Sequence, residues 1–266
     1  MQLCRVVRCA VVGHLEWVEF ARVERLPESG HIGRATEVWS EPAGGGTVIA
    51  AQIAKLAGRC EFFTALGDDD LGHRTVAALA EIGLDVHAQH FGQTRRAFTH
   101  VEDSGERTIT VLGEKLLPRG PLPLDGYDAV FFVAGDVAAL HSARAARFLA
   151  ATSREFPTLS EGGVHLDLLV GSAIDPGERY DGGLDVDVVV RTEGARGGTV
   201  DGTTRYEPAP LPGPIVDTYG AGDSFAAALC FALARGDSLD DALGLATRAG
   251  AGVITGKGPY TAQISA

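Results

Sequence analysis

The sequence predicts an α/β fold of three layers (α/β/α), in which a mostly parallel β-sheet lies between layers of helices. Short apolar runs typical of buried strands alternate with helical patterns along the chain, as in sheets whose parallel strands are joined by helices. Several runs are apolar at consecutive positions, which indicates strands covered on both faces. A chain of 266 residues can bury a sizeable core, and no linker, repeat or low-complexity run divides it. We therefore expect residues 1–266 to form a single domain.

The composition excludes several classes of partner. The net charge of −12 argues against nucleic acid or an anionic membrane surface. The four cysteines have no C-x-x-C spacing, so neither a zinc site nor a disulfide framework is indicated. The N-terminal residues do not form a signal peptide, and no apolar run reaches the length of a membrane span. These observations predict a cytoplasmic protein.

The elements follow from apolar periodicity and from the residues that end each pattern. The first is a buried strand at 6–12, ended by Gly13, and the short alternating pieces of 20–40 favour strands and turns over helix. The later elements are a helix at about 48–57, a strand at 60–67, a helix at 73–82, a hairpin of 97–102 and 107–112, a strand at 128–133, a helix at 138–151, strands at 166–170 and 186–190, and helices at 224–235 and about 238–250. The acidic triplet 68–70 is typical of a helix start, and Gly236 of a helix end.

The most informative stretch is 217–225, Asp-Thr-Tyr-Gly-Ala-Gly-Asp-Ser-Phe, which runs directly into an apolar helix. Gly220, Ala221 and Gly222 carry almost no side chain, so their backbone N–H groups are open to a ligand. A helix N-terminus with free N–H groups attracts anions. Asp223 adds a carboxylate at the same point. It acts either as the helix N-cap or as an acid that takes a proton from a group attacking the anion.

The whole string resembles the signature of the ribokinase-type (PfkB) carbohydrate kinase family. Members of that family use ATP to phosphorylate hydroxymethyl groups of sugars and nucleosides. The resemblance implies that the amides of Gly220, Ala221 and Gly222 form an anion hole for the transferring phosphate. It also implies that Asp223 is the catalytic base, and that ATP and Mg²⁺ are the cofactors.

The resemblance extends to residues that would hold the nucleotide and its metal. Thr192, Gly194 and Gly197 follow a buried strand and fit the family's T-x-G-x-x-G spacing, where a hydroxyl and glycine amides meet the ATP phosphates. Asp217, at the start of the signature, is assigned to the same cofactor site. Asp175 stands where the family has the acid of N-x-x-E, which helps to place Mg²⁺ through water. An aspartate before proline also fits a simple turn.

Two glycines and two acids are the candidates for binding the acceptor. Gly44 and Gly45 lie in a Gly-Gly-Gly run that resembles the family's hinge, where the backbone approaches the sugar. The family's Asn beyond this run falls on Ile49 here. Glu16 and Glu19 are the acids closest to the family's substrate-binding Asp. A solvated acidic edge remains the alternative for both.

The family's Asp itself falls on Val18 of this chain. By resemblance, 20–40 and 97–112 form a small β lid on a ribokinase-like fold. Arg96 and Arg107 belong to this lid. For each of them the alternatives are a position near the substrate and a plain solvated surface. The apolar face of such a lid makes a homodimer through the lid possible.

The predicted function is ATP-dependent phosphorylation of a hydroxymethyl group on a small sugar or sugar-like substrate. A nucleoside kinase of the same fold is an alternative, because Trp17 and Phe20 leave room for an aromatic acceptor pocket. A non-catalytic nucleotide or sugar sensor is another, since Val18 and Ile49 replace expected polar groups. An NAD-linked oxidoreductase is disfavoured because the first strand is not followed by G-x-G-x-x-G.

Overall fold

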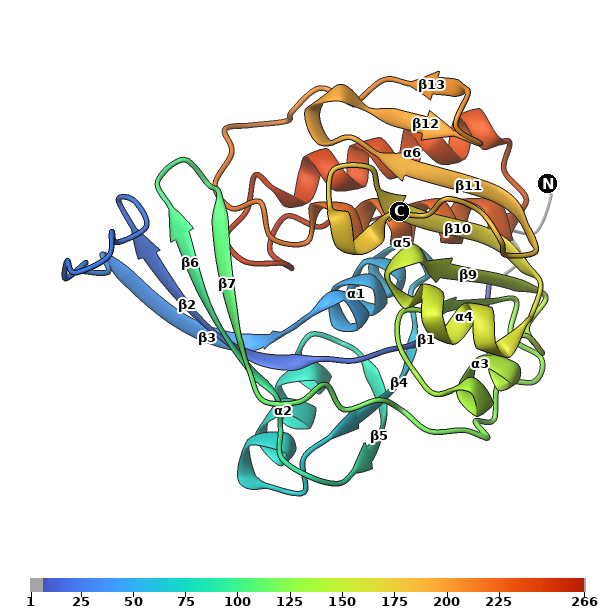
Figure 1. Ribbon diagram of the computed structural model, residues 1–266, viewed down its shortest axis with the longest axis horizontal. Coiled ribbons are helices and arrows are strands. Elements are labelled where there is room, and N and C mark those ends of the chain that lie inside the picture. Colours follow the sequence, from blue (N-terminus) through green and yellow to red (C-terminus); the bar gives the residue numbers. More distant parts are fainter. Residues whose placement is uncertain (1–6, 266) are drawn as a thin grey trace.

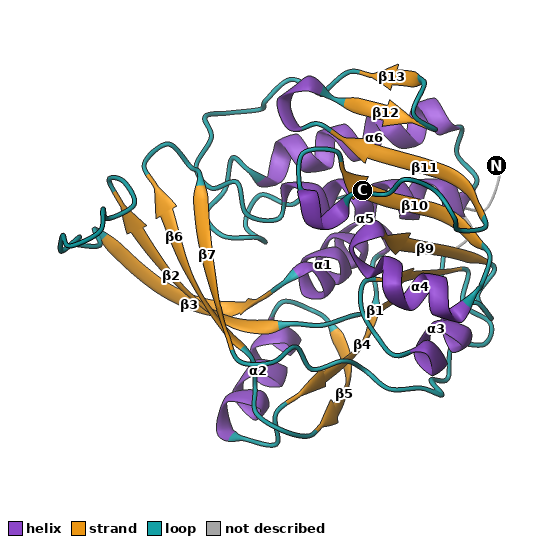
Figure 2. Ribbon diagram, in the orientation of Figure 1, coloured by secondary structure: helices purple, strands orange, loops and turns teal. Residues whose placement is uncertain are grey.

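The computed structural model describes residues 7–265 and consists of two sheets with helices packed around the larger one (Figures 1 and 2). The main sheet has nine strands in the order β13-β12-β11-β10-β9-β8-β1-β4-β5. Its strands are β1 (Cys9–Val12), β4 (Glu61–Leu66), β5 (Asp85–His90), β8 (Ala129–Phe132), β9 (Phe148–Thr152), β10 (Leu166–Ser172), β11 (Val186–Thr192), β12 (Gly198–Val200) and β13 (Thr204–Tyr206). All neighbours from β5 to β11 are parallel, whereas β12 and β13 are antiparallel.

The main sheet is buried on both faces, which explains its runs of consecutive apolar residues. Val11 and Phe131 belong to one apolar cluster, while Val12 and Phe132 belong to a second cluster on the opposite face, because successive side chains of a strand alternate between faces. Helices α1 (Gly45–Ala57), α2 (Asp70–Glu81), α5 (Ala221–Arg235) and α6 (Leu239–Val253) contribute to the first cluster, and α3 (Val137–Ala143) and α4 (Phe156–Gly162) to the second. The predicted three-layer α/β fold is confirmed.

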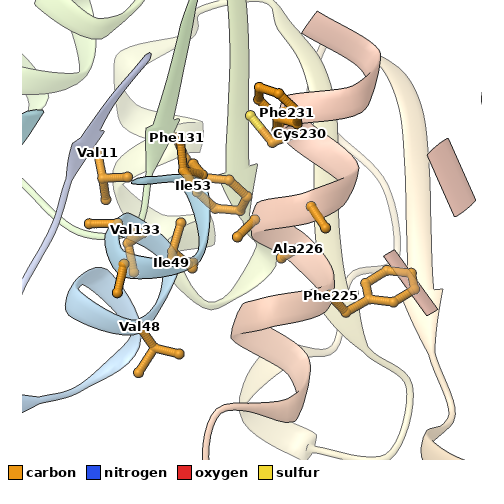
Figure 3. Packing of buried hydrophobic residues seen from close by; sticks show 14 of the residues in the cluster. Val11, Val48, Ile49, Ile53, Phe131, Val133, Phe225, Ala226, Cys230 and Phe231 are labelled. Carbon is orange, nitrogen blue, oxygen red and sulfur yellow. The ribbon is translucent and has the colours of Figure 1, made fainter. Parts of the chain in front are cut away.

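Helices α1 and α5 pack together against the first face of the sheet. Figure 3 shows Ile49 and Ile53 of α1 beside Phe131 of β8, with Ala226 of α5 near them. The signature helix ends as expected, since Gly236 adopts the left-handed conformation with φ 98°. Both helices begin on the side of the sheet where the parallel strands have their carboxyl ends. Their packing therefore holds the two N-termini close to each other.

A second sheet of four strands projects from the main body and appears at the left of Figure 1. Its order is β3-β2-β6-β7, with bounds β2 (Glu16–Val23), β3 (Glu37–Ala43), β6 (Arg96–Glu102) and β7 (Arg107–Leu112). The two segments expected to form the lid, 20–40 and 97–112, therefore share one sheet apart from the core. We call this four-stranded sheet the lid.

One predicted helix is wrong in its second half. The stretch 138–151 forms α3 only as far as Ala143, and Phe148–Thr152 is the parallel strand β9 between β8 and β10. Pairing with two neighbouring strands outweighs the helix propensity of Ala150 and Ala151. The predicted first strand is observed from Cys9, and Val6 lies outside the described residues. Within residues 7–265 no helix is long and apolar enough to cross a membrane.

Candidate active site

The site lies at the carboxyl ends of β1 and β8, where the chain leaves the sheet in opposite directions. The lid and α1 follow β1, and α1 packs on one face of the sheet, whereas α3 follows β8 and packs on the other. Such a switch point leaves a crevice at the strand ends. The packing there is close, because a Cβ on Gly13 would stand 3.0 Å from the Cα of Gly46.

The N-terminus of α5 presents free amides at this crevice. Gly220 is the N-cap and has φ 83°, a conformation that favours glycine. The N–H of Ser224 donates to Gly220 O at 2.8 Å, so the amides of Ala221, Gly222 and Asp223 precede the first helical bond. A Cβ on Gly222 would meet nothing within 4 Å. The glycine turn thus exposes N–H groups at the positive end of the helix dipole.

Asp223 is not the helix N-cap. It is in the first turn of α5, whose N-cap makes no side-chain hydrogen bond, so the capping alternative is wrong. Burial raises the pKa of Asp223 to about 6, and the charge of Glu178 adds to the shift, while Arg107 and Arg154 oppose it. A carboxyl with this pKa is ionised at neutral pH and still accepts a proton readily.

The paired glycines lie directly against Asp223. A Cβ on Gly45 would stand 3.1 Å from Asp223 Oδ1. Gly44 has φ 96°, and its N–H donates to the hydroxyl oxygen of Tyr219 at 3.1 Å. The structure therefore brings Gly44 and Gly45, the predicted acceptor-binding glycines, into contact with the signature turn.

Glu16 reaches the same place from the start of β2, whereas Glu19 does not. The Glu16 carboxylate packs against Gly44, where a Cβ would lie 3.3 Å from its Oε2. Burial raises the pKa of Glu16. Three residues along the strand, Glu19 points to the opposite face and pairs with Arg96. Of the two candidate acids, only Glu16 lies against the Gly44–Gly45 pair.

The two substituted family positions are part of the core. Val18 is fully buried in β2, and Ile49 is buried between α1 and the sheet (Figure 3). Phe20 is equally buried, stacked on Trp39 with ring centroids 4.9 Å apart and meeting the edge of Tyr219 at 5.4 Å. The inner face of the lid is thus filled by the chain's own side chains at these positions.

The Thr192 loop lies beside α5. Thr192 ends β11 next to Ser172, which ends β10. Gly194 and Gly197 have positive φ values of 60° and 75°, and a Cβ on Gly197 would stand 2.0 Å from a backbone oxygen, so only glycine fits there. Tyr206 at the end of β13 stacks on Phe225 of α5, with ring centroids 5.7 Å apart. The loop and the helix N-terminus are held on one side of the molecule.

Asp217 organises the signature loop from within. Its side chain is fully buried; Oδ1 accepts from the N–H of Tyr219 at 2.9 Å and Oδ2 from the N–H of Gly258 at 3.1 Å. Both oxygens are therefore used by backbone amides of the chain. Arg107 supports the same loop from the lid, since its guanidinium donates to Thr218 O at 2.9 Å.

Asp175 starts a turn, as one of its two readings predicted. Its Oδ1 accepts from the N–H of Gly177 at 2.8 Å, which together with Arg154 holds the pKa of the carboxyl low. Arg154 also pairs with Glu178 at 2.8 Å. Asp175 and Glu178 offer carboxylate oxygens, the ligands that Mg²⁺ prefers, but all four oxygens accept hydrogen bonds from Gly177, Ser172 and Arg154. Mg²⁺ would therefore have to replace donors of the chain at these two acids.

Four functional candidates escaped the sequence analysis: Tyr219, Arg95, Arg154 and Glu178. Tyr219 is the one large residue in a turn of small ones, and this contrast could have identified it from the sequence. Arg95 precedes β6 and Arg154 lies in a short 3-10 helix after β9, and only the pairing of the strands brings them near Glu16 and Asp223. Glu178 lies three residues after Asp175, the acid expected from the family spacing, so the spacing did not identify it.

Comparisons with known proteins agree with this geometry. A model of the pfkB family of carbohydrate kinases matches residues 7–154 and 180–265. The chain is 34% identical over 113 residues to an ATP-dependent ribose-1-phosphate kinase of Halopiger xanaduensis, a match covering 41% of this chain and only 37% of that relative's length. It is 26% identical over 270 residues to an aminoimidazole riboside kinase of Salmonella typhimurium, covering 83% and 84% of the two chains.

A solved structure shares the fold. A putative ribokinase from Agrobacterium tumefaciens matches with a TM-score of 0.80 over 98% of this chain and 95% of that one, at 20% identity. The family model covers the lid segments and the signature helix, which build the part of the site around Asp223, whereas Asp175 and Glu178 lie in the unmatched stretch 155–179. The chain therefore belongs to the pfkB family of carbohydrate kinases.

Proposed function

We propose that the protein transfers the γ-phosphoryl group of ATP to a hydroxymethyl group of a small sugar or sugar-like substrate. The observation that carries the proposal is Asp223, a carboxyl with a pKa of about 6 in the first turn of a helix whose N-terminal amides are free. An anion site and a proton acceptor at one point suit attack of a hydroxyl on a phosphate. The names of the relatives, an ATP-dependent sugar-phosphate kinase and a riboside kinase, support a sugar-type acceptor and ATP.

The reaction transfers one proton and one phosphoryl group. Asp223 accepts the hydroxymethyl proton as the oxygen forms its bond to the γ-phosphorus, and the bond from that phosphorus to the bridging oxygen of ADP breaks. The amides of Gly220, Ala221 and Gly222 donate to the phosphoryl oxygens while charge builds on them. Loss of one such donor typically costs about 10²-fold to 10³-fold in rate.

The remaining candidates serve the nucleotide and the acceptor. Thr192, Gly194 and Gly197 would meet the ATP phosphates through a hydroxyl and backbone amides, and Asp217 would keep the adjoining turn in place. Glu16 and Gly44 would contact the acceptor beside Asp223. Glu19 would contribute only through the lid's outer face, where Arg96 holds it.

Mg²⁺ would be held by Asp175 and Glu178 together with nucleotide oxygens. When bound, the ion neutralises the charge of the phosphates. Arg154 donates hydrogen bonds to both acids and would keep their carboxylates oriented toward one point.

The two alternatives, a nucleoside kinase and a non-catalytic sensor, are supported to different degrees. Trp17 and Phe20 are buried against this chain's own Arg74, Trp39 and Tyr219, so neither offers a free face to a nucleobase. A nucleoside nevertheless remains a possible acceptor in a screen, because one relative is a riboside kinase. A non-catalytic sensor has no use for an acid whose burial tunes its pKa toward neutrality.

A homodimer through the lid and a cytoplasmic location complete the proposal. Val38 of β3 is 71% exposed, and Val111 and Leu112 of β7 are also exposed, so both edge strands of the lid carry apolar side chains that a second copy would cover. Cys9, Cys60 and Cys230 are buried free thiols, which fits a reducing compartment. Sedimentation at several protein concentrations tests the dimer.

The decisive test is phosphoryl transfer over a panel of sugars, sugar phosphates and nucleosides with Mg-ATP, comparing the wild-type protein with Asp223→Asn. We expect ADP and a phosphorylated product with at least one acceptor, and a loss of about 10²-fold to 10⁴-fold in the variant, the usual contribution of a general base. Full activity in Asp223→Asn would contradict the mechanism. No transfer to any acceptor by the folded wild-type protein would favour the sensor.

A further inference from the structure

Tyr219 joins the signature loop to the point where the chain leaves the lid. Its hydroxyl oxygen accepts from the N–H of Gly44 at 3.1 Å, and the residue is buried. Gly44 stands between Ala43, the last residue of β3, and Gly45, the first residue of α1. A side chain of the loop that carries Asp223 thus holds the backbone between the lid and the main body. We call Gly44 and Gly45 the hinge pair.

The hinge pair depends on this bond because its own residues have no side chain to hold it. Gly44 is the N-cap of α1, and the cap makes no side-chain hydrogen bond. Its φ of 96° lies in a region that glycine adopts as readily as negative φ values, so sterics alone do not fix the peptide. The carbonyl of Gly44 accepts from the N–H of Val48 at 3.1 Å, and the amide is held by Tyr219. A turn of this peptide would move Gly45, where a Cβ would stand 3.1 Å from Asp223 Oδ1.

The ring of Tyr219 is held by both the signature loop and the lid. The backbone N–H of Tyr219 donates to Asp217 Oδ1 at 2.9 Å. On the lid side, Phe20 of β2 packs against the ring at an angle of 71°, with centroids 5.4 Å apart. The guanidinium of Arg107 of β7 lies over the ring, 5.5 Å from its centroid, where a cation is attracted to the aromatic face. Movement of the lid strands therefore changes the contacts of the ring whose hydroxyl holds Gly44.

Tyr219 itself stays protonated. Burial raises the pKa of its hydroxyl, and the charges of Glu16 and Asp223 raise it further. The hydroxyl therefore does not compete with Asp223 for the acceptor proton, because an effective base has a pKa near the working pH. Its role must come from what it holds in place.

We propose that Tyr219 is a positioning residue for the transfer reaction: its hydroxyl sets the hinge pair against Asp223, and its ring makes that setting depend on the lid. This inference rests on the proposed function, because it concerns the alignment of the same base. With the lid strands against the ring, the hinge pair confines the Asp223 carboxylate at the start of α5. Without the hydroxyl bond, the Gly44 peptide is free to turn, and the carboxylate loses one wall of its site. The chemistry of Asp223 is thereby linked to the position of the lid.

Tyr219→Phe tests the inference, because it removes one oxygen and keeps the ring with its lid contacts. We expect kcat to fall by about 10-fold to 10²-fold, since misplacement of a reacting group by about 1 Å can cost about 10²-fold. KM for Mg-ATP should change by less than about 2-fold, because a loss confined to the transition-state geometry appears in kcat. The Gly44 N–H loses its acceptor, so its hydrogen exchange with solvent should become faster.

Tyr127→Phe is the matched control. Tyr127 is as buried as Tyr219, and its hydroxyl bonds to Glu61. It precedes β8 and Glu61 begins β4, so this bond lies at the amino ends of the strands, away from the site. The control loses a buried hydroxyl bond of the same kind, so its melting temperature should fall by a similar amount while kcat keeps the wild-type value. An equal fall of kcat in both variants would make Tyr219 a stabilising residue only and overturn the inference.

A double variant shows whether Tyr219 acts through the hinge pair. Gly45→Ala places a methyl group against Asp223 Oδ1. If both changes disturb the same contact, the double variant should lose less activity than the product of the two single losses, as expected for residues that share a partner. Losses that multiply would overturn the route through Gly44 and Gly45.

Hydrogen exchange at Gly44 separates this inference from the proposed function, because it needs no turnover. An active wild-type protein with an equally active Tyr219→Phe would keep the kinase and refute the positioning role. A folded wild-type protein that transfers no phosphoryl group would refute the kinase, and Gly44 exchange would then decide whether the hydroxyl holds the hinge pair. Unchanged Gly44 exchange in Tyr219→Phe would refute that bond in either case.

Discussion

The carboxylate of Asp223 lies against the backbone of Gly45, so closely that a Cβ on Gly45 would stand 3.1 Å from Asp223 Oδ1. Gly45 is the first residue of α1, and Asp223 lies in the first turn of α5. The two helices pack along their length (Figure 3), so their N-terminal turns are held in contact. The proposed base is therefore positioned by the segment that connects the lid to the main body.

Gly45→Ala should lower activity more than stability. The added methyl group would press on Asp223 Oδ1 and approach Val133 Cγ1 at 3.4 Å, while the φ of Gly45 is compatible with alanine. A displaced base loses alignment, and misplacement by about 1 Å can cost about 10²-fold in rate. We expect kcat to fall by about 10-fold or more with a small change in melting temperature.

The matched control for this variant is Gly244→Ala in α6. A methyl group there meets only Arg248 at 3.6 Å, an ordinary contact, and alanine favours the helix. Its kcat should equal that of the wild-type protein. A Gly45→Ala protein with unchanged kcat would show that Asp223 does not depend on this contact.

The rate should depend on pH through Asp223. A base must be ionised, and the pKa of Asp223 is raised to about 6. For the free enzyme we expect kcat/KM to decline about tenfold per pH unit below about 6 and to level off above it. The profile should be measured from pH 5 to 8 with the preferred acceptor. A flat profile over this range would exclude Asp223 as the titrating base.

The difference in stability between the wild-type protein and Asp223→Asn should depend on pH, and the pKa of Asp223 fixes its sign. The folded-state pKa lies above the usual 3.8, so the folded protein binds the proton more tightly and loses stability as pH rises from about 4 to about 6. The shift to about 6 corresponds to at most about 3 kcal/mol. Asparagine stays neutral, so above pH 6 the variant should be at least as stable as the wild-type protein, and below pH 4 it should have no advantage.

Denaturant unfolding of both proteins at pH 4 and pH 7 measures this difference. If Asp223 stabilised the helix as a cap, the variant would instead be less stable by about 1 kcal/mol at neutral pH. That result would contradict the burial argument.

Arg107 should stabilise the contact between the lid and the signature loop around Thr218. Its guanidinium donates to Thr218 O and Oγ1 at 2.9 and 3.2 Å, and its charge lowers the pKa of Asp223. Arg107→Leu should therefore raise KM for the acceptor by about 3-fold to 10-fold, about 1 kcal/mol of lost lid contact. It should also move the midpoint of the pH profile upward.

Amide exchange in β7 provides a structural readout for Arg107→Leu. Protection of residues 107–112 should fall in the variant and stay unchanged in Arg96→Gln, whose side chain lies on the other face of the lid. An unchanged pH midpoint together with unchanged exchange would contradict the proposed connection.

Mg-ATP should raise the melting temperature of the wild-type protein. Tyr206 lies against Gly197 of the Thr192 loop and stacks on Phe225 in the first turns of α5, so we expect one phosphate chain to reach both segments. A ligand that binds only the folded state stabilises it in proportion to the logarithm of its concentration. No shift at millimolar Mg-ATP, with a shift by a nicotinamide dinucleotide, would instead favour an oxidoreductase.

The sequence predicted those parts of the fold that are encoded locally. Helix α5 was identified by its apolar run and by Gly236, and α2 by its acidic start, where Asp69 is indeed the cap. β9 was missed because its alanines favour helix, and only the strands on either side make it a strand. Strand pairing between distant segments is invisible to local periodicity.

The candidate site divides in the same way. Asp223 and the glycines before it lie within one motif, so the sequence alone identified them as site candidates, and the same holds for Gly45. Arg95 was not, because its position beside Glu16 depends on the parallel pairing of β2 with β6, two segments far apart in sequence. Glu19 was retained as a candidate for lack of the strand register that sends it to the other face.

Residues 257–264 act as a strap across the site, and this has a consequence for biosynthesis. Gly258 bonds to Asp217, Tyr260 to Pro42 O, and Gln263 to Val48 O, so the signature turn and the start of α1 are both completed by this segment. During translation the sheet strands, the lid and α5 leave the ribosome before these contacts exist. A nascent chain can thus acquire its sheet while Asp217 lacks the Gly258 amide. Enzymatic competence would emerge in a late step, when the strap leaves the exit tunnel and docks.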